Sequence, residues 1–135
     1  MLKHSEIYLR TFENGYSPLI DACERDLTEI SIMLIDNGAD INFLDNDQKW
    51  SPLMWAITNN NEIITQKILE KNCDLNRVDS DGNSALHLAT SSENDTLVRM
   101  LLNRNANKNL VNSENMTPLQ IAKENEDEYC IKLLS

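Results

Sequence analysis

The chain has 135 residues and a mass of 15.4 kDa, and 41% of its residues are hydrophobic, which is enough to bury one core of ordinary domain size. Its formal charge of −10 disfavours a nucleic acid or an anionic membrane as the partner and favours a basic partner. No apolar run approaches the roughly 18 residues that a membrane-spanning helix needs, and the N-terminus lacks a signal-peptide pattern. We therefore expect a soluble, cytoplasmic protein.

Four short segments signal the start of a helix and recur along the chain. They begin at positions 17, 51, 84 and 117, so the intervals are 34, 33 and 33 residues, and they read SPLIDA, SPLMWA, SALHLA and TPLQIA. The leading Ser or Thr can cap a helix N-terminus, and proline suits the first helical position. Leucine and alanine three residues apart then share one helix face. The pattern predicts a helix at the start of each unit.

A second helix is expected in each unit, because apolar residues follow at helical spacing. The predicted buried pairs are Ile30 with Leu34, Ile64 with Ile68, Leu97 with Leu101, and Cys130 with Leu134. Gly38, Asn72 and Asn105 are expected in the left-handed conformation that ends a helix. Turn residues then form a finger that leads to the next unit, and the finger over residues 45–50 has one extra residue.

The recurring hexapeptide resembles the T-P-L-H-x-A signature of ankyrin repeats, whose period is about 33 residues. Residues 34–42, 68–76 and 101–109 are similar to the family's second landmark, L-L-x-x-G-A-D-V-N. The resemblance implies an all-α fold, an ankyrin-repeat solenoid of stacked helix-turn-helix units with β-turn fingers. It predicts a single domain over residues 1–135, with an N-terminal cap at 1–13 and repeats at about 14–45, 46–78, 79–111 and 112–135. The last repeat stops inside its second helix and is expected to act as a C-terminal cap.

No motif in the sequence indicates catalysis. The chain has no G-x-S-x-G, H-E-x-x-H, P-loop or G-x-G-x-x-G pattern, so we expect no catalytic residue, no cofactor and no enzyme activity. The cysteines Cys23, Cys73 and Cys130 are far apart and form no CxxC pair, which is typical of small buried residues rather than of a metal site. His87 occupies the histidine slot of its hexapeptide, where the family uses imidazole to hold a neighbouring loop.

Binding is therefore the function that the resemblance implies. In the family, the fingers and the exposed side of the first helices form a concave surface that contacts partners. We predict a partner-binding role for the finger residues Tyr16, Asp47, Trp50, Asp81, Asn83, Glu114 and Met116 and for the first-helix residues Arg25, Trp55 and Asn59. Trp50 is the favoured anchor because it lies on the longest finger. For Trp55 a place in the core and a place in the contact surface both remain open.

Several residues depart from the family pattern. Lys49 and Asn115 replace the finger glycine, which predicts strained turns. Ala85 replaces the helix-start proline, and Lys108 stands where an apolar residue is expected, so we predict that the junction between the third and fourth repeats is the softest.

Two functions fit these patterns. The first is a monomeric adaptor or scaffold that binds another protein, with a basic segment as the expected feature of that partner. The alternative is a small inhibitor that occludes an enzyme or a transcription factor, including a pathogen effector that acts on a host protein in the host cytosol. The two differ in whether binding abolishes the partner's activity.

Overall fold

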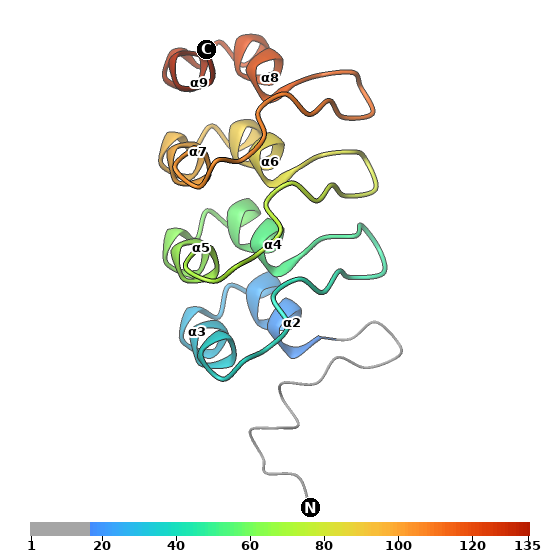
Figure 1. Cartoon of the computed structure of the whole chain (residues 1–135), viewed down its shortest axis with the longest axis vertical. Coiled ribbons are helices and arrows are strands. Elements are labelled where there is room, and N and C mark those ends of the chain that lie inside the picture. Colours follow the sequence, from blue (N-terminus) through green and yellow to red (C-terminus); the bar gives the residue numbers. More distant parts are fainter. Residues whose placement is uncertain (1–16) are drawn as a thin grey trace, which may run out of the picture. The chain divides into compact units, whose positions relative to one another are not determined.

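The computed structural model describes residues 17–135 and consists, within them, of eight α-helices without a strand (Figure 1). The helices are α2 (Pro18–Glu24), α3 (Thr28–Asp36), α4 (Pro52–Thr58), α5 (Glu62–Leu69), α6 (Ala85–Ser91), α7 (Asp95–Leu102), α8 (Pro118–Glu124) and α9 (Glu128–Leu134). The predicted all-α fold is therefore confirmed. The predicted N-terminal cap at residues 1–13 and the predicted contact residue Tyr16 lie outside the described residues.

The first helix of each pair begins where the hexapeptides predict it. The hydroxyls of Ser17, Ser51, Ser84 and Thr117 each accept a hydrogen bond from the backbone N–H three residues later. In α6 and α8 the residue that donates this N–H, His87 or Gln120, also accepts a hydrogen bond through its side chain from the backbone N–H of the cap residue. The two bonds together form a capping box. These local bonds satisfy amides that would otherwise have no partner at a helix start.

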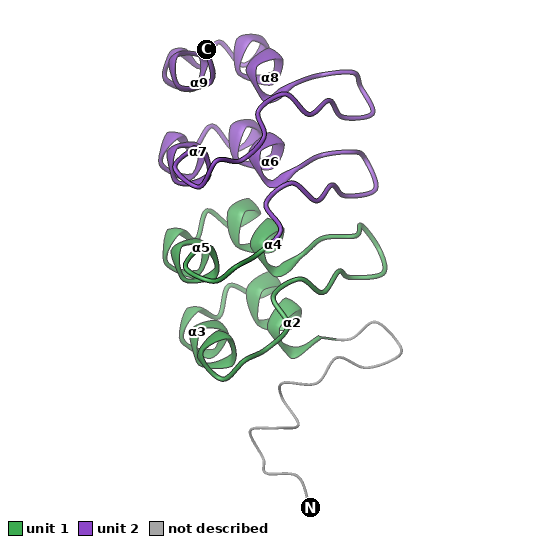
Figure 2. Cartoon of the chain, viewed as in Figure 1, with its two compact units in different colours: residues 1–73 green, residues 74–135 purple. Residues whose placement is uncertain are grey.

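The helices form two compact units, residues 1–73 and residues 74–135, which Figure 2 shows in different colours. In the first unit, α2 packs against α4 and α3 packs against α5. In the second unit, α6 packs against α8 and α7 packs against α9. Small residues on the first helices make this packing close, since Ala22, Ala56, Ala89 and Ala122 are each at most 2% exposed. Stacking of helix pairs thus buries apolar faces that one pair could not bury alone.

One predicted core residue is not in the core. Ile30 is 46% exposed, whereas Ile64, in the same register of α5, is fully buried. The buried residues of α3 are instead Ser31, Leu34 and Ile35. Ile64 is covered because α3 packs against α5, while Ile30 lies on the side of α3 that no described helix covers.

The second helices end in two different ways. Gly38 and Asn105 have the predicted left-handed backbone, with φ of 90° and 62°, and Ala39 and Ala106 then donate to carbonyls of the preceding helix. Asn72 does not have a positive φ, so that prediction is wrong.

The different end of α5 affects the cysteine beside it. The N–H of Cys73 donates to the carbonyl of Lys71, two residues earlier, and Cys73 is only partly buried. Our prediction of a buried residue therefore fails for Cys73. It is confirmed for Cys23 and Cys130, which are fully buried, and burial raises the pKa of both thiols to about 12.

Strained backbone is more common than the sequence indicated. Lys49 and Asn115 both have a φ of 61°, so the fingers keep the glycine conformation without glycine, as predicted. The residue between the two helices of each repeat also has a positive φ, which we did not predict. These residues are Asp26, Asn60, Glu93 and Glu126, with φ of 59°, 55°, 54° and 56°. For a residue with a Cβ this conformation is unfavourable by roughly 1–2 kcal/mol.

Candidate functional site

Each described finger is shaped by one Asp or Asn at its base. The Oδ1 atom of Asp45 accepts hydrogen bonds from the backbone N–H groups of Gln48 and Trp50, at 3.0 and 3.1 Å. Asp79 and Asn112 bind two backbone N–H groups of their own fingers in the same way, at 2.9 to 3.0 Å. Sequence reasoning missed these three residues, although an Asp or Asn recurring at the repeat interval before a turn was an available signal.

The finger of the first unit brings two predicted contact residues together. The rings of Trp50 and Trp55 lie 4.6 Å apart between centroids and meet at 69°. The indole N–H of Trp55 donates to Oδ2 of Asp45 at 2.9 Å, so the finger base also orients the first helix's tryptophan. Both indoles are half-buried, and Asp47 is exposed at the tip of the finger. Trp55 therefore packs against the finger and is also partly exposed, and its contact with a partner stays a prediction.

The two fingers of the second unit are joined to each other by hydrogen bonds. Asn112 Nδ2 donates to Asn83 Oδ1 at 2.9 Å, and the N–H of Ser113 donates to the carbonyl of Asp81 at 2.9 Å. A Cβ added at Gly82 would lie 3.0 Å from the backbone nitrogen of Ser113, so only glycine lets the fingers approach this closely.

The His87 side chain also connects the third repeat to the fourth. Its Nε2 atom lies 2.9 Å from the carbonyl of Met116, and its Nδ1 atom lies 2.8 Å from the hydroxyl of Ser84. The imidazole is fully buried, and burial lowers its pKa below the ordinary value of 6.5. The structural role predicted for His87 is thus confirmed.

These contacts connect the third and fourth repeats, and that their junction is the softest stays a prediction. The boundary between the two compact units falls between Cys73 and Asp74, next to the irregular end of α5. Lys108 is exposed, and the backbone N–H of the neighbouring Asn107 donates to the Asn76 side chain at 2.8 Å.

The remaining predicted contact residues occupy different environments. Asn59 Nδ2 donates to the carbonyls of Cys23 and Glu24 at 2.8 and 3.2 Å, so this side chain ties α4 to α2. The Arg25 side chain is 64% exposed and pairs with Asp21 at 3.5 Å. Asp81 and Glu114 are exposed on the fingers of the second unit, and Met116 is half-buried.

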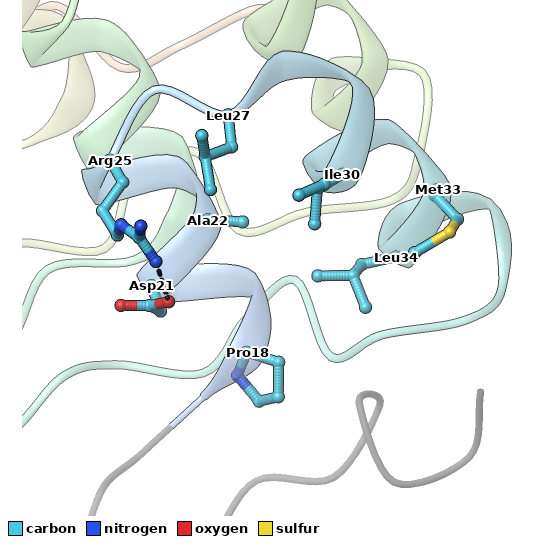
Figure 3. A pocket seen from close by; sticks show the side chains of 8 residues that line it. All are labelled: Pro18, Asp21, Ala22, Arg25, Leu27, Ile30, Met33 and Leu34. Atoms are coloured by element: carbon cyan, nitrogen blue, oxygen red, sulfur yellow. Dashed lines mark ion pairs between the residues drawn. The ribbon is translucent and has the colours of Figure 1, made fainter. Parts of the chain in front are cut away.

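A pocket of about 300 Å³ lies on the first unit, on the side of α2 and α3 (Figure 3). It is lined by Pro18, Asp21, Ala22, Arg25, Leu27, Ile30, Met33 and Leu34. The Asp21–Arg25 ion pair lies at one edge, and the exposed side chains of Ile30 and Met33 lie at the other. Sequence reasoning missed this pocket because it assigned Ile30 to the core. The mostly apolar lining suits an apolar side chain better than a reacting group.

The described residues form neither a metal-binding cluster nor a membrane-spanning helix. Between residues 17 and 135, no three His, Cys, Asp or Glu side chains are grouped so that they could hold a metal ion. Among the helices that the structure describes, none is long and apolar enough to cross a membrane.

Comparison with known proteins identifies the repeat. The family model for ankyrin repeats, in three copies, matches residues 1–79 and 63–135. The chain is 28% identical over 87 residues to a putative ankyrin repeat protein of Acanthamoeba polyphaga mimivirus, and 33% identical over 85 residues to the B-cell lymphoma 3 protein homolog of Mus musculus. These alignments cover 64% and 63% of this chain but 11% and 19% of those proteins. The predicted ankyrin-repeat solenoid is thereby confirmed.

Proposed function

Because the chain belongs to the ankyrin-repeat family, whose members are generally protein–protein interaction modules, we propose that it binds a partner protein through its fingers and first helices. In this proposal it acts in the cytoplasm as an adaptor or scaffold, as one monomeric domain of four repeats. The family is generally not enzymatic, and the proposed site needs no cofactor.

The observation that carries the proposal is the half-buried indole pair of Trp50 and Trp55 on the finger of the first unit. Large aromatic side chains contribute most to the binding energy of many interfaces. Here both rings are held in place, by their mutual contact and by the 2.9 Å bond from Trp55 to Asp45. A rigid anchor loses little conformational entropy on binding, which favours affinity.

Charge indicates the kind of partner. Asp47, Asp81 and Glu114 are exposed on the fingers, and no lysine or arginine of the described residues forms an ion pair with them. Together with the net charge of −10, this favours a partner with a basic segment, since complementary charge speeds association and suppresses wrong partners.

The test is a pull-down with the full chain, followed by mass spectrometry, in which wild type is compared with Trp50→Ala and Ile63→Ala. Ile63 is 64% exposed on the second helix of the same repeat, so its substitution is a matched control for loss of a surface apolar group. A protein captured by wild type and Ile63→Ala but lost with Trp50→Ala supports the proposal. Equal capture by all three chains would place the binding surface elsewhere.

A triple charge reversal of Asp47, Asp81 and Glu114 then tests the basic segment. We expect capture of the same partner to weaken, and to weaken most at low salt, where exposed charges are least screened. Unchanged capture would exclude the charge argument. An assay of the captured partner's own activity separates an adaptor from an inhibitor, because only an inhibitor abolishes that activity on binding.

A further inference from the structure

We propose that the Trp50–Trp55 pair, with the carboxylates of Asp45 and Asp47, binds an arginine side chain in the basic segment of the partner. The inference rests on the proposed function and adds to it the chemical group that is recognised at one finger.

The first argument is the geometry of the rings. Indoles that meet at 69° pack edge to face and do not stack face to face, and both tryptophans are only partly buried. The face of an indole ring attracts a cation placed above it, and tryptophan does this best among the aromatic residues. The pair therefore offers π-surface to an incoming cation at a fixed position.

The second argument is the charge beside the rings. The Asp45 carboxylate accepts hydrogen bonds from three neutral groups, namely the backbone N–H groups of Gln48 and Trp50 and the indole N–H of Trp55. Within the described residues, neither Asp45 nor Asp47 forms an ion pair with a lysine or arginine. The finger thus holds two carboxylates whose charge no described cation neutralises.

The charge of the surrounding surface points the same way. Between residues 40 and 50 the chain has three carboxylates, Asp40, Asp45 and Asp47, against one ammonium group, Lys49. On the adjacent helix α2, Asp21 occupies the register that Trp55 occupies on α4, and Arg25 already pairs with it. A cationic occupant is therefore favoured over an acidic or a neutral one.

Arginine fits this combination better than lysine does. Its guanidinium is planar, so it can stack on an indole face while its N–H groups point in the ring plane toward a carboxylate. The lysine ammonium is compact and strongly hydrated, and it cannot satisfy both interactions with one flat group.

The test uses the fact that the chain has two tryptophans and both are in the proposed site. The full chain, labelled with ¹⁵N, is titrated with three pentapeptides that differ at one position: arginine, lysine, or citrulline, which is the neutral analogue of arginine. The shifts of the two indole N–H signals are followed at 150 mM salt. We expect saturable shifts with the arginine peptide, binding weaker by roughly three-fold or more with lysine, and no shift with citrulline.

Two variants form a matched pair. Asp47→Asn and Glu62→Gln each remove one charge from an exposed residue of the same repeat, but Glu62 lies at the start of the second helix, α5, and not on the finger. We expect Asp47→Asn to weaken arginine binding several-fold and Glu62→Gln to leave it unchanged. Trp50→Ala retains the Trp55 signal, and the arginine peptide should no longer shift it.

The proposal is overturned if citrulline binds as well as arginine, if lysine binds equally well, if both charge variants weaken binding to the same extent, or if no peptide shifts either indole signal. The pull-down is independent of these results. A partner that is lost with Trp50→Ala in the absence of arginine binding would leave the proposed function standing and remove this inference alone.

Discussion

Asp127 provides a test of how the repeats hold each other, because it is an N-cap with one satisfied and one unsatisfied oxygen. Its Oδ1 atom accepts a hydrogen bond from the N–H of Cys130 at 3.1 Å. Its Oδ2 atom is buried and has no hydrogen-bond partner in the described part of the chain. The Cys130 thiol has a pKa raised to about 12, by burial first and then by Asp127 and the negative charges of Asp95 and Glu93.

The N-cap position of the second repeat is occupied by Asn61, whose amide has hydrogen-bond partners for both its oxygen and its nitrogen. Asn61 caps α5 through Oδ1, which accepts from the N–H of Ile64 at 2.9 Å. Its Nδ2 group donates to Asp26 and Thr28 of the preceding repeat, both at 2.8 Å. Asp127→Asn would keep the cap and turn the oxygen without a partner into a donor, and the preceding repeat has Glu93 and Asp95 in the register of Asp26 and Thr28.

We expect Asp127→Asn to raise the free energy of unfolding by about 2 kcal/mol. An unsatisfied buried polar group costs about 1–3 kcal/mol, and a new hydrogen bond contributes about 1 kcal/mol at most sites. The assay is urea unfolding followed by circular dichroism at pH 7, where this gain moves the midpoint by roughly 1 M if the urea dependence is near 2 kcal/mol/M.

Two controls separate the causes. Glu114→Gln also removes one negative charge, but from an exposed finger residue, and should change the midpoint little. Asp127→Ala removes the cap, which contributes about 1 kcal/mol, together with the buried oxygen, so this variant should be less stable than Asp127→Asn. If Asp127→Asn is no more stable than wild type, the buried oxygen of Asp127 does not lower the free energy of unfolding, and the reasoning is refuted.

Three other predictions concern backbone strain, the close approach of two fingers and the titration of a buried histidine. Lys49→Gly and Glu93→Gly should each raise the free energy of unfolding by about 1 kcal/mol, because both residues have a positive φ. Lys49→Ala should not raise it, and equal urea midpoints for Lys49→Gly and Lys49→Ala would contradict this explanation. Gly82→Ala should lower it by at least about 1 kcal/mol, since the new Cβ meets the backbone at 3.0 Å where φ is 76°, and thermal unfolding checks this. Burial lowers the pKa of His87 in the folded chain below its ordinary value of 6.5, so the unfolded chain binds a proton at a higher pH than the folded chain does. The free energy of unfolding should therefore be largest above pH 6.5 and should fall as the pH drops toward the pKa of folded His87. Urea midpoints between pH 5 and 8 should show this decline in wild type and a smaller one in His87→Gln.

The local signals in the sequence were reliable because their physical range is short. A hydroxyl at Ser51 can reach the N–H three residues later whatever the rest of the chain does, and Pro52 suits the position that follows. The glycine-like turns at Lys49 and Asn115 were also predictable, since their place in the repeat specifies the backbone. The positive φ of Glu93 and Glu126 was missed because no turn residue marks those positions.

The contact residues were harder to assign, since a position in a repeat does not say what a side chain touches. Asn59 was predicted to face a partner, but its amide is used to bind the carbonyls of Cys23 and Glu24, more than 30 residues away in sequence. Asp45 was overlooked, although it orients both tryptophans of the finger. Whether the predicted residues bind a partner stays a prediction.

By itself, the sequence determined the repeat, its period, the starts of the first helices and the membership of an interaction family, because hydroxyl caps, proline and helical spacing act over a few residues. The tertiary structure alone decided which side chains are covered. Ile30 and Ile64 are the same residue type in the same register, yet one is 46% exposed and the other fully buried. Burial depends on which helix packs alongside, and that neighbour is not encoded in the local pattern.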